Sequence, residues 1–187
     1  PGTPNTYTIT VNPTPTVIVP ANITICNGGN IPASVFTSTP AGGTFTWTNS
    51  NPALGLAVSG AGNTPAFVAT NLTGASITGT ITVTPTVAGC PGTPNTYTIT
   101  VNPTPDVVQP VDLQLCNGAS TGIINFTGSV NATTYNWTNS NTTIGLSAAS
   151  GSGNITSFTA VNNGSAAQTA NIVVTPVLGS CSGSTTT

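Results

Sequence analysis

Four cysteines carry the most reactive side chains of this 187-residue sequence, namely Cys26, Cys90, Cys116 and Cys181. Cysteines at matching places in two copies of a unit suit disulfide bonds formed in an oxidising compartment. A zinc site would need four ligands at short spacings, and the chain has no histidine and no Cys-x-x-Cys pair. We therefore expect these cysteines to form disulfides, and we expect neither a metal nor a cofactor.

Titratable side chains that could support catalysis are almost absent. The chain has no Lys, Arg, His or Glu, and its only acidic residues are Asp106 and Asp112. A Ser or Thr nucleophile needs a base, and proton transfer needs groups poised near neutral pH. We expect no enzymatic activity and no catalytic residue. A nucleic-acid partner is also not expected, because neutralising phosphates requires Lys or Arg. The two carboxylates could contribute to a weak calcium site, but we interpret them as solvated surface groups.

Two tryptophans allow two interpretations. Trp47 and Trp137 each follow another aromatic residue by two positions, Phe45 and Tyr135. Such rings could stack on a sugar, but alternation in a strand places both members of a pair on the same face. A tryptophan on a central strand is the usual core anchor of an immunoglobulin-like sandwich. We therefore predict that both tryptophans are core anchors.

These residues belong to a unit of about 90 residues that is written twice. The letters PGTPNTYTITVNPTP at 1–15 return at 91–105, and the tryptophans and cysteines recur in the same register. Repetition of this kind is typical of stalks, fibres and binding arrays.

Short stretches that alternate β-branched or aromatic residues with Thr, Ser or Asn predict half-buried strands throughout. In the first full unit we expect strands at 16–19 continuing through 23–26, 34–37, 44–48, 66–70, 77–84 and 97–101. Gly- and Pro-containing segments predict turns between them, including Gly60–Gly62 and its counterpart Gly151–Gly153, which lack the helix that a phosphate loop requires. No amphipathic helix is evident. The pattern predicts an all-β fold of tandem sandwiches.

The repeat boundary is predicted to lie after a final strand and a short Pro-containing linker. Residues 13–102 then form the first complete sandwich, and residues 103–187 form a second that lacks its final strand. Residues 1–12 would be the final strand of a preceding repeat, or a donor strand that completes a neighbouring molecule. The donor residues would be Thr6, Tyr7, Thr8, Ile9, Thr10 and Val11. We interpret the chain as a segment of a longer array or a strand-exchanging subunit.

Four motifs give the chain a family resemblance. They are TICNG at 24–28, FTWTNS at 45–50, ITVTPTVAGC at 81–90 and YTITVNP at 97–103. It resembles the immunoglobulin-like and polycystic-kidney-disease-like (PKD-like) tandem repeats of large secreted surface proteins of Bacteroidota. The resemblance implies export, cell-surface display and a head-to-tail array. It departs from many such domains at 49–51 and 139–141, where Asn-Ser-Asn replaces an Asp-rich motif, so that calcium would lack anionic ligands there.

Two disulfide connectivities remain open. Similar spacings favour bonds within each repeat, Cys26 with Cys90 and Cys116 with Cys181. An immunoglobulin-like path instead places the two cysteines of one repeat at opposite ends of the sandwich, beyond the ~7 Å limit between Cα atoms. That path brings Cys26 close to Cys181 and leaves Cys90 and Cys116 for preceding and following copies.

The first functional hypothesis is a structural repeat segment of an extracellular bacterial surface fibre or stalk. Its partners would be copies of itself or neighbouring repeats, joined by head-to-tail stacking, strand donation and disulfides. The alternative is an adhesin module that binds glycans or surfaces through loops such as 49–63. No apolar run approaches the ~18 residues of a membrane span, so we expect no membrane span in this segment. The paired cysteines and the family resemblance imply an extracellular or cell-surface location.

Overall fold

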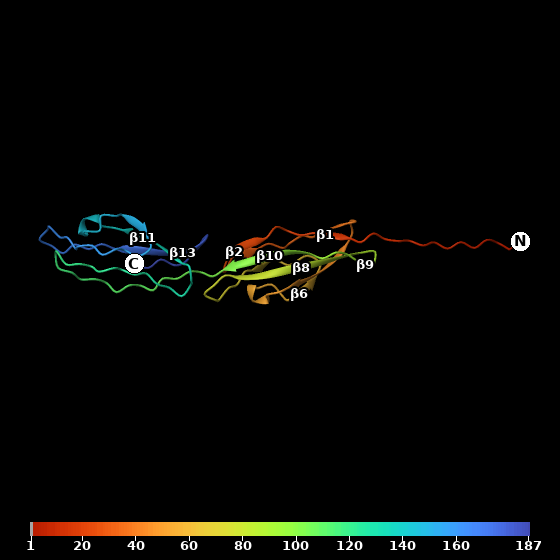
Figure 1. The fold of residues 1–187 in the computed structure, drawn as a ribbon, viewed down its shortest axis with the longest axis horizontal. Helices are drawn as coiled ribbons and strands as arrows, with labels where there is room; N and C mark the ends of the chain where they lie inside the picture. Colours follow the sequence, from red (N-terminus) through yellow and green to blue (C-terminus); the bar gives the residue numbers. More distant parts are fainter. Residues whose placement is uncertain (1) are drawn as a thin grey trace. The chain divides into compact units, whose positions relative to one another are not determined.

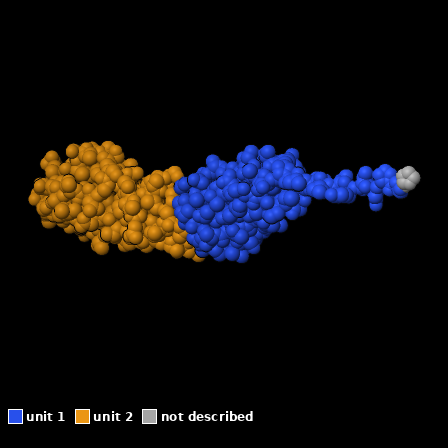
Figure 2. Space-filling view, turned by 45° about the vertical axis from the view of Figure 1, so that its right-hand side comes forward, with its two compact units in different colours: residues 1–24, 29–70, 78–100 blue, residues 25–28, 71–77, 101–187 orange. Residues whose placement is uncertain are grey.

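The computed structural model describes residues 2–187, which divide into two compact units (Figure 2). Unit 1 holds the described residues up to Thr24, with Gly29–Thr70 and Thr78–Thr100. Unit 2 holds Ile25–Gly28, Asn71–Ile77 and Val101–Thr187. Two short segments of the first sequence repeat therefore belong structurally to the second unit.

The first repeat is organised by a six-stranded sheet in the order β2-β10-β8-β5-β6, with β9 also paired to β8 (Figure 1). The strands are β2 (Ile23–Cys26), β5 (Thr44–Asn49), β6 (Ser59–Ala61), β8 (Ile77–Val87), β9 (Cys90–Pro91) and β10 (Asn95–Asn102). In β8 and β10, threonines alternate with mostly apolar residues, and the face that carries the apolar residues is buried. The buried side chains on these strands are Ile81, Val83, Tyr97, Ile99 and Val101.

Two small strand pairs provide the opposing layer of this repeat. β1 (Thr16–Ile18) pairs with β4 (Thr37–Thr39), and β3 (Asn30–Ile31) pairs with β7 (Phe67–Val68). Phe36 lies between the layers, with its ring centroid 5.7 Å from that of Phe45 and 6.4 Å from that of Tyr97. This aromatic cluster closes the sandwich.

The second repeat has a four-stranded sheet in the order β12-β11-β13-β14. Its strands are β11 (Thr134–Asn139), β12 (Ser150–Ser152), β13 (Ile172–Leu178) and β14 (Cys181–Ser182). Trp137 stands opposite Gly151 and Val174, as Trp47 stands opposite Gly60 and Val83. The buried core of the second repeat includes Phe126, Trp137, Ile155 and Val174.

The all-β prediction is confirmed, and the only helical turns of residues 2–187 are two 3-10 turns, η1 (Pro52–Leu54) and η2 (Thr142–Ile144). Within those residues no helix is long and apolar enough to cross a membrane. The expected strand at 34–37 is reduced to a Ser34–Thr64 bridge followed by β4.

The expected turn at Gly60 and Gly151 is wrong for these two residues, which lie inside β6 and β12. A Cβ added to Gly60 would come within 2.6 Å of Cε2 of the Trp47 indole, and Gly151 meets Trp137 in the same way. Any larger residue at these two positions would overlap the indole ring that packs against the backbone, so glycine is required there. The left-handed φ of +73° at Gly62 fits the turn that follows.

Candidate functional site

The most distinctive chemical feature is a disulfide between Cys26 and Cys181, with Cα atoms 5.6 Å apart and 155 positions between them in sequence. Cys26 ends β2 and Cys181 begins β14, yet both belong to unit 2. Cys181 is buried and Cys26 is half-buried. The bond therefore joins the first cysteine of one sequence repeat to the second cysteine of the following repeat.

The other two cysteines are free thiols in the structure. Cys90 is half-buried at the start of β9, and Cys116 is exposed. Neither of the bonds within a repeat, Cys26 with Cys90 or Cys116 with Cys181, is formed. The structure thus holds the connectivity that follows from an immunoglobulin-like path, with Cys90 and Cys116 left over.

Asparagine side chains organise the backbone beside the disulfide, all within unit 2. The backbone N–H of Asn27 donates to Asn102 O at 2.8 Å, and its side-chain oxygen accepts from Asn71 N–H at 2.8 Å. Asn71 Nδ2–H donates to Ala75 O and to Val101 O at 2.8 and 2.7 Å. Buried amides that replace backbone partners fix these loops to the end of β10.

Sequence reasoning did not single out Asn27 or Asn71. The signal that could have found them is internal, because the same letters recur at Asn117 and Asn162. Asn162 N–H donates to Asn117 Oδ1 at 2.9 Å, which repeats the first pair. In a single sequence, asparagine predicts a turn. The sequence alone therefore does not indicate that Asn71 is a buried residue whose side chain binds several backbone groups.

Both tryptophans are buried, Trp47 at 4% exposure and Trp137 at 7%. Trp137 Nε1–H donates to Gly153 O at 3.1 Å. Trp47 Nε1–H has no partner among the described residues. Neither ring presents a face to a sugar, and their placement is that of core side chains.

The loop after Trp47 is held by its own asparagines. Asn49 is 3% exposed, and its Nδ2–H donates to Leu56 O at 2.9 Å while its Oδ1 accepts from Asn51 N–H at 3.0 Å. Asn51 caps η1 by accepting from Ala53 N–H. The side-chain amides of Asn49 and Asn51 therefore hold the backbone of this loop.

The two carboxylates lie in unit 2 and form no metal cluster. Asp106 Oδ1 accepts from the N–H and the hydroxyl of Ser129 at 2.8 and 2.9 Å, and these bonds lower the pKa of Asp106. Burial, together with the charge of Asp106, raises the pKa of Tyr135. Asp112 is exposed. No group of three or more His, Cys, Asp or Glu side chains gathers within residues 2–187.

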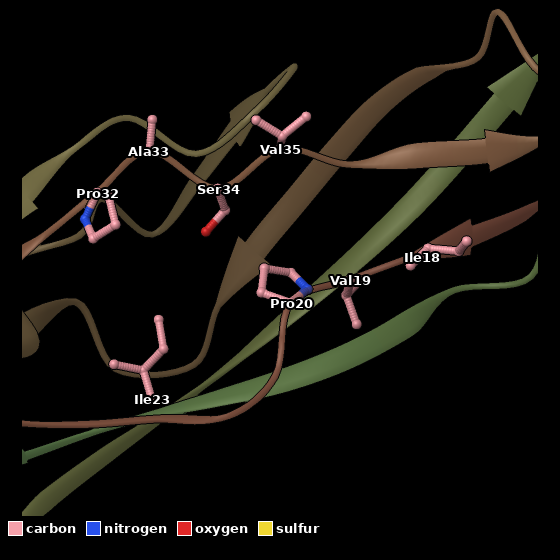
Figure 3. Close-up of a pocket in the computed structure, with 8 residues that line it drawn as sticks. All are labelled: Ile18, Val19, Pro20, Ile23, Pro32, Ala33, Ser34 and Val35. Atoms are coloured by element: carbon pink, nitrogen blue, oxygen red, sulfur yellow. The ribbon is translucent and has the colours of Figure 1, made fainter.

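An open hollow of about 290 Å³ lies in unit 1 between residues 18–23 and 32–35 (Figure 3). Seven of its eight labelled side chains are Ile, Val, Pro or Ala, and the eighth is Ser34. The Ser34 hydroxyl lies 3.3 Å from the Tyr97 hydroxyl and is already paired. The hollow therefore offers no acid, base or metal ligand.

The proposed donor residues lie in no strand (Figure 1). All six are exposed, Thr6, Tyr7, Thr8, Ile9, Thr10 and Val11. The apolar members Tyr7, Ile9 and Val11 are 84%, 78% and 88% exposed.

A family model described as a PKD-like domain matches residues 23–105. Residues 23–105 are a PKD-like domain. The PKD-like domain runs from β2 to three residues beyond β10, and so includes Trp47, Cys26 and Cys90. Among curated proteins, none matches the chain. A disulfide and a PKD-like domain are both consistent with an extracellular protein.

Proposed function

We propose that the chain is a structural segment of an extracellular bacterial surface fibre or stalk. In this proposal, PKD-like β-sandwich repeats follow one another head to tail and are held by disulfides. The segment bears load and catalyses no reaction. Its partners are neighbouring repeats or further copies of the chain.

The Cys26–Cys181 bond is the observation that carries the proposal. It pairs the first cysteine of one repeat with the second cysteine of the next. Cys116 is the first cysteine of its own repeat, and Cys90 is the second of its own. Applied again, the same rule pairs Cys116 with a following repeat and Cys90 with a preceding one. A connectivity that can be continued at both ends is suited to an array.

The composition supports a durable, closely packed material. Only 1% of the residues are charged, and no Lys or Arg is available to proteases that cut at basic residues. Surfaces without charge can pack together without burying an unpaired ion, which would be costly.

The adhesin alternative gains no support from the loop at 49–63. An aromatic platform for a glycan is lacking there because Trp47 is buried. The amides of Asn49 and Asn51 bind the backbone of their own loop.

Electron microscopy of the purified 187-residue protein tests the proposal. The sample is held in a glutathione redox buffer, and a Cys90→Ser/Cys116→Ser variant serves as the matched control. We expect linear oligomers or filaments with an axial period of one or two repeats, which shorten in the variant. Isolated particles at high protein concentration, indistinguishable from the control, would show that the chain is not a fibre segment.

A further inference from the structure

The Cys26–Cys181 bond determines which parts of the chain can carry tension. Its two Cα atoms lie 5.6 Å apart, while 155 positions separate the two cysteines in sequence. A fully extended chain spans about 3.3–3.6 Å per residue, so that these positions correspond to roughly 510–560 Å of contour length. While the bond is closed, a single covalent link bridges all of that length.

Tension that enters the chain before Cys26 and leaves it after Cys181 has two routes. The covalent route runs along β2 to the bond and continues into β14, because Cys26 ends β2 and Cys181 begins β14. The other route runs through every residue between the two cysteines, and therefore through the cores around Trp47 and Trp137. The covalent route is far shorter, so the closed bond takes the tension.

The segment between the two cysteines contains the central strands of both repeats. β5, β8 and β10 belong to it in the first repeat, and β11 and β13 belong to it in the second. A bond of Cys26 with Cys90 would have left the second repeat in the path of the tension. A bond of Cys116 with Cys181 would have left the first repeat there. The observed bond shelters the central strands of both.

Hydrogen bonds beside the disulfide hold the same segments of unit 2 together. Asn27 N–H donates to Asn102 O at 2.8 Å, and Asn27 Nδ2–H donates to Thr104 Oγ1 at 3.4 Å. Asn131 N–H donates to Gly74 O at 3.2 Å. All three are hydrogen bonds between uncharged groups, whose net contribution in water is modest. Without Lys, Arg or His, the side chains offer no cation that could reinforce them by an ion pair. The disulfide is therefore the strong link at this position.

A thiol can open the disulfide without acting on these hydrogen bonds. Cys181 is 2% exposed, whereas Cys26 is half-buried. A thiolate of a dithiol reductant therefore attacks the sulfur of Cys26, the more exposed of the two cysteines. A mixed disulfide forms, and Cys181 leaves as a thiolate that takes up a proton. The second thiolate of the reductant then displaces Cys26, which is also protonated, so that the reductant becomes a disulfide and supplies the two electrons.

We propose that the Cys26–Cys181 bond is a redox-controlled bypass for tension. While the bond is closed, tension passes from β2 to β14, and residues 27–180 carry none. Reduction places both sandwiches in the path of the tension, so that they unfold and the chain lengthens. This inference rests on the proposed function, because it describes how a load-bearing segment resists extension and what releases it.

Single-molecule pulling of the full chain tests the bypass. Peptide tags fused to the two ends of the chain attach the handles without cysteine chemistry, and Cys90→Ser/Cys116→Ser prevents thiol exchange. Cys26→Ser in the same background is the matched control. In an oxidising buffer we expect the final contour length of the control to exceed that of the parent by roughly 510–560 Å. Equal final lengths would overturn the proposal.

This comparison does not depend on the stability of the control. A Cys26→Ser chain that is already unfolded before pulling still reports its full contour length. Only the parent needs to form the disulfide, and peptide mapping of the oxidised parent verifies that bond.

Addition of dithiothreitol to a parent molecule held under tension tests the redox control. We expect the molecule to lengthen to the contour length of the control, and the control itself to be insensitive to the dithiol. A parent that stays short after prolonged exposure to dithiothreitol would overturn the redox control.

The bypass and the fibre function fail in different ways. If oxidised parent molecules lengthen as far as the control while filaments form in the electron microscope, the bypass is wrong and the fibre function stands. If the oxidised contour length is short and dithiothreitol extends it but no filaments form, the fibre function fails and the redox-controlled contour length stands.

Discussion

Removing the Cys26–Cys181 bond should strongly lower the free energy of unfolding. The bond closes a loop of 155 positions. In the chain-entropy model, a loop of that length restricts the unfolded state by about 17 cal/mol/K, or about 5 kcal/mol at 25 °C. A typical domain has a total stability of about 5 to 15 kcal/mol, so that the loss should be large.

The measurement compares Cys26→Ser with its parent in a Cys90→Ser/Cys116→Ser background, which prevents thiol exchange. Guanidinium denaturation is followed by the fluorescence of the two buried tryptophans. We expect a clear fall in the transition midpoint for whole-chain unfolding, and a smaller fall if only one repeat unfolds, since a folded repeat shortens the effective loop. Peptide mapping with chymotrypsin is needed because the chain has no Lys or Arg. Equal midpoints in the two variants, or a Cys26–Cys90 peptide from the wild-type chain, would refute the reasoning.

Three further predictions concern single side chains. Gly60→Ala and Gly151→Ala should each destabilise by about 1 to 3 kcal/mol, because the new methyl group overlaps the indole ring beside it; an unchanged melting temperature would contradict this. Asn49→Ala should cost about 2 kcal/mol or more, since it leaves buried backbone groups unpaired, as a denaturant midpoint would show. The pKa of Asp106 is lowered in the folded state, so its contribution is present above the unfolded value of 3.8 and is lost as the pH falls through the folded value. The melting temperature should therefore fall below about pH 4 and fall less in Asp106→Asn, whose bonds to Ser129 do not titrate; identical pH profiles would count against this role.

The strands could be located from the sequence because their alternation is strong. Residues 77–84 and 97–101 were expected as strands, and they lie in β8 and β10. β6 was missed because Ser-Gly-Ala carries no hydrophobic signal of its own. Its place is set by Trp47 on the neighbouring strand, which needs an empty position beside it. A tertiary contact thus overrides the local preference of glycine for turns.

The disulfide connectivity could not be determined from the sequence. The spacing of cysteines along the chain does not show which of them lie close together in the folded protein. Cys26 ends β2 and Cys181 begins β14, and only the folded chain brings these two strand ends together. The role of Asn71 is likewise apparent only from its hydrogen bonds to Ala75 O and Val101 O.

The length of the disulfide loop also determines the order of events as the chain emerges from its amino-terminal end. Cys26 is synthesised 155 positions before its partner Cys181. Cys90 and Cys116 are synthesised between these two cysteines, and either thiol is available to react with Cys26 before Cys181 is. The correct bond is therefore chosen by folded geometry and not by order of appearance. The Cys26–Cys181 bond therefore requires that β2 and β14, which lie in different sequence repeats, have both reached their folded positions.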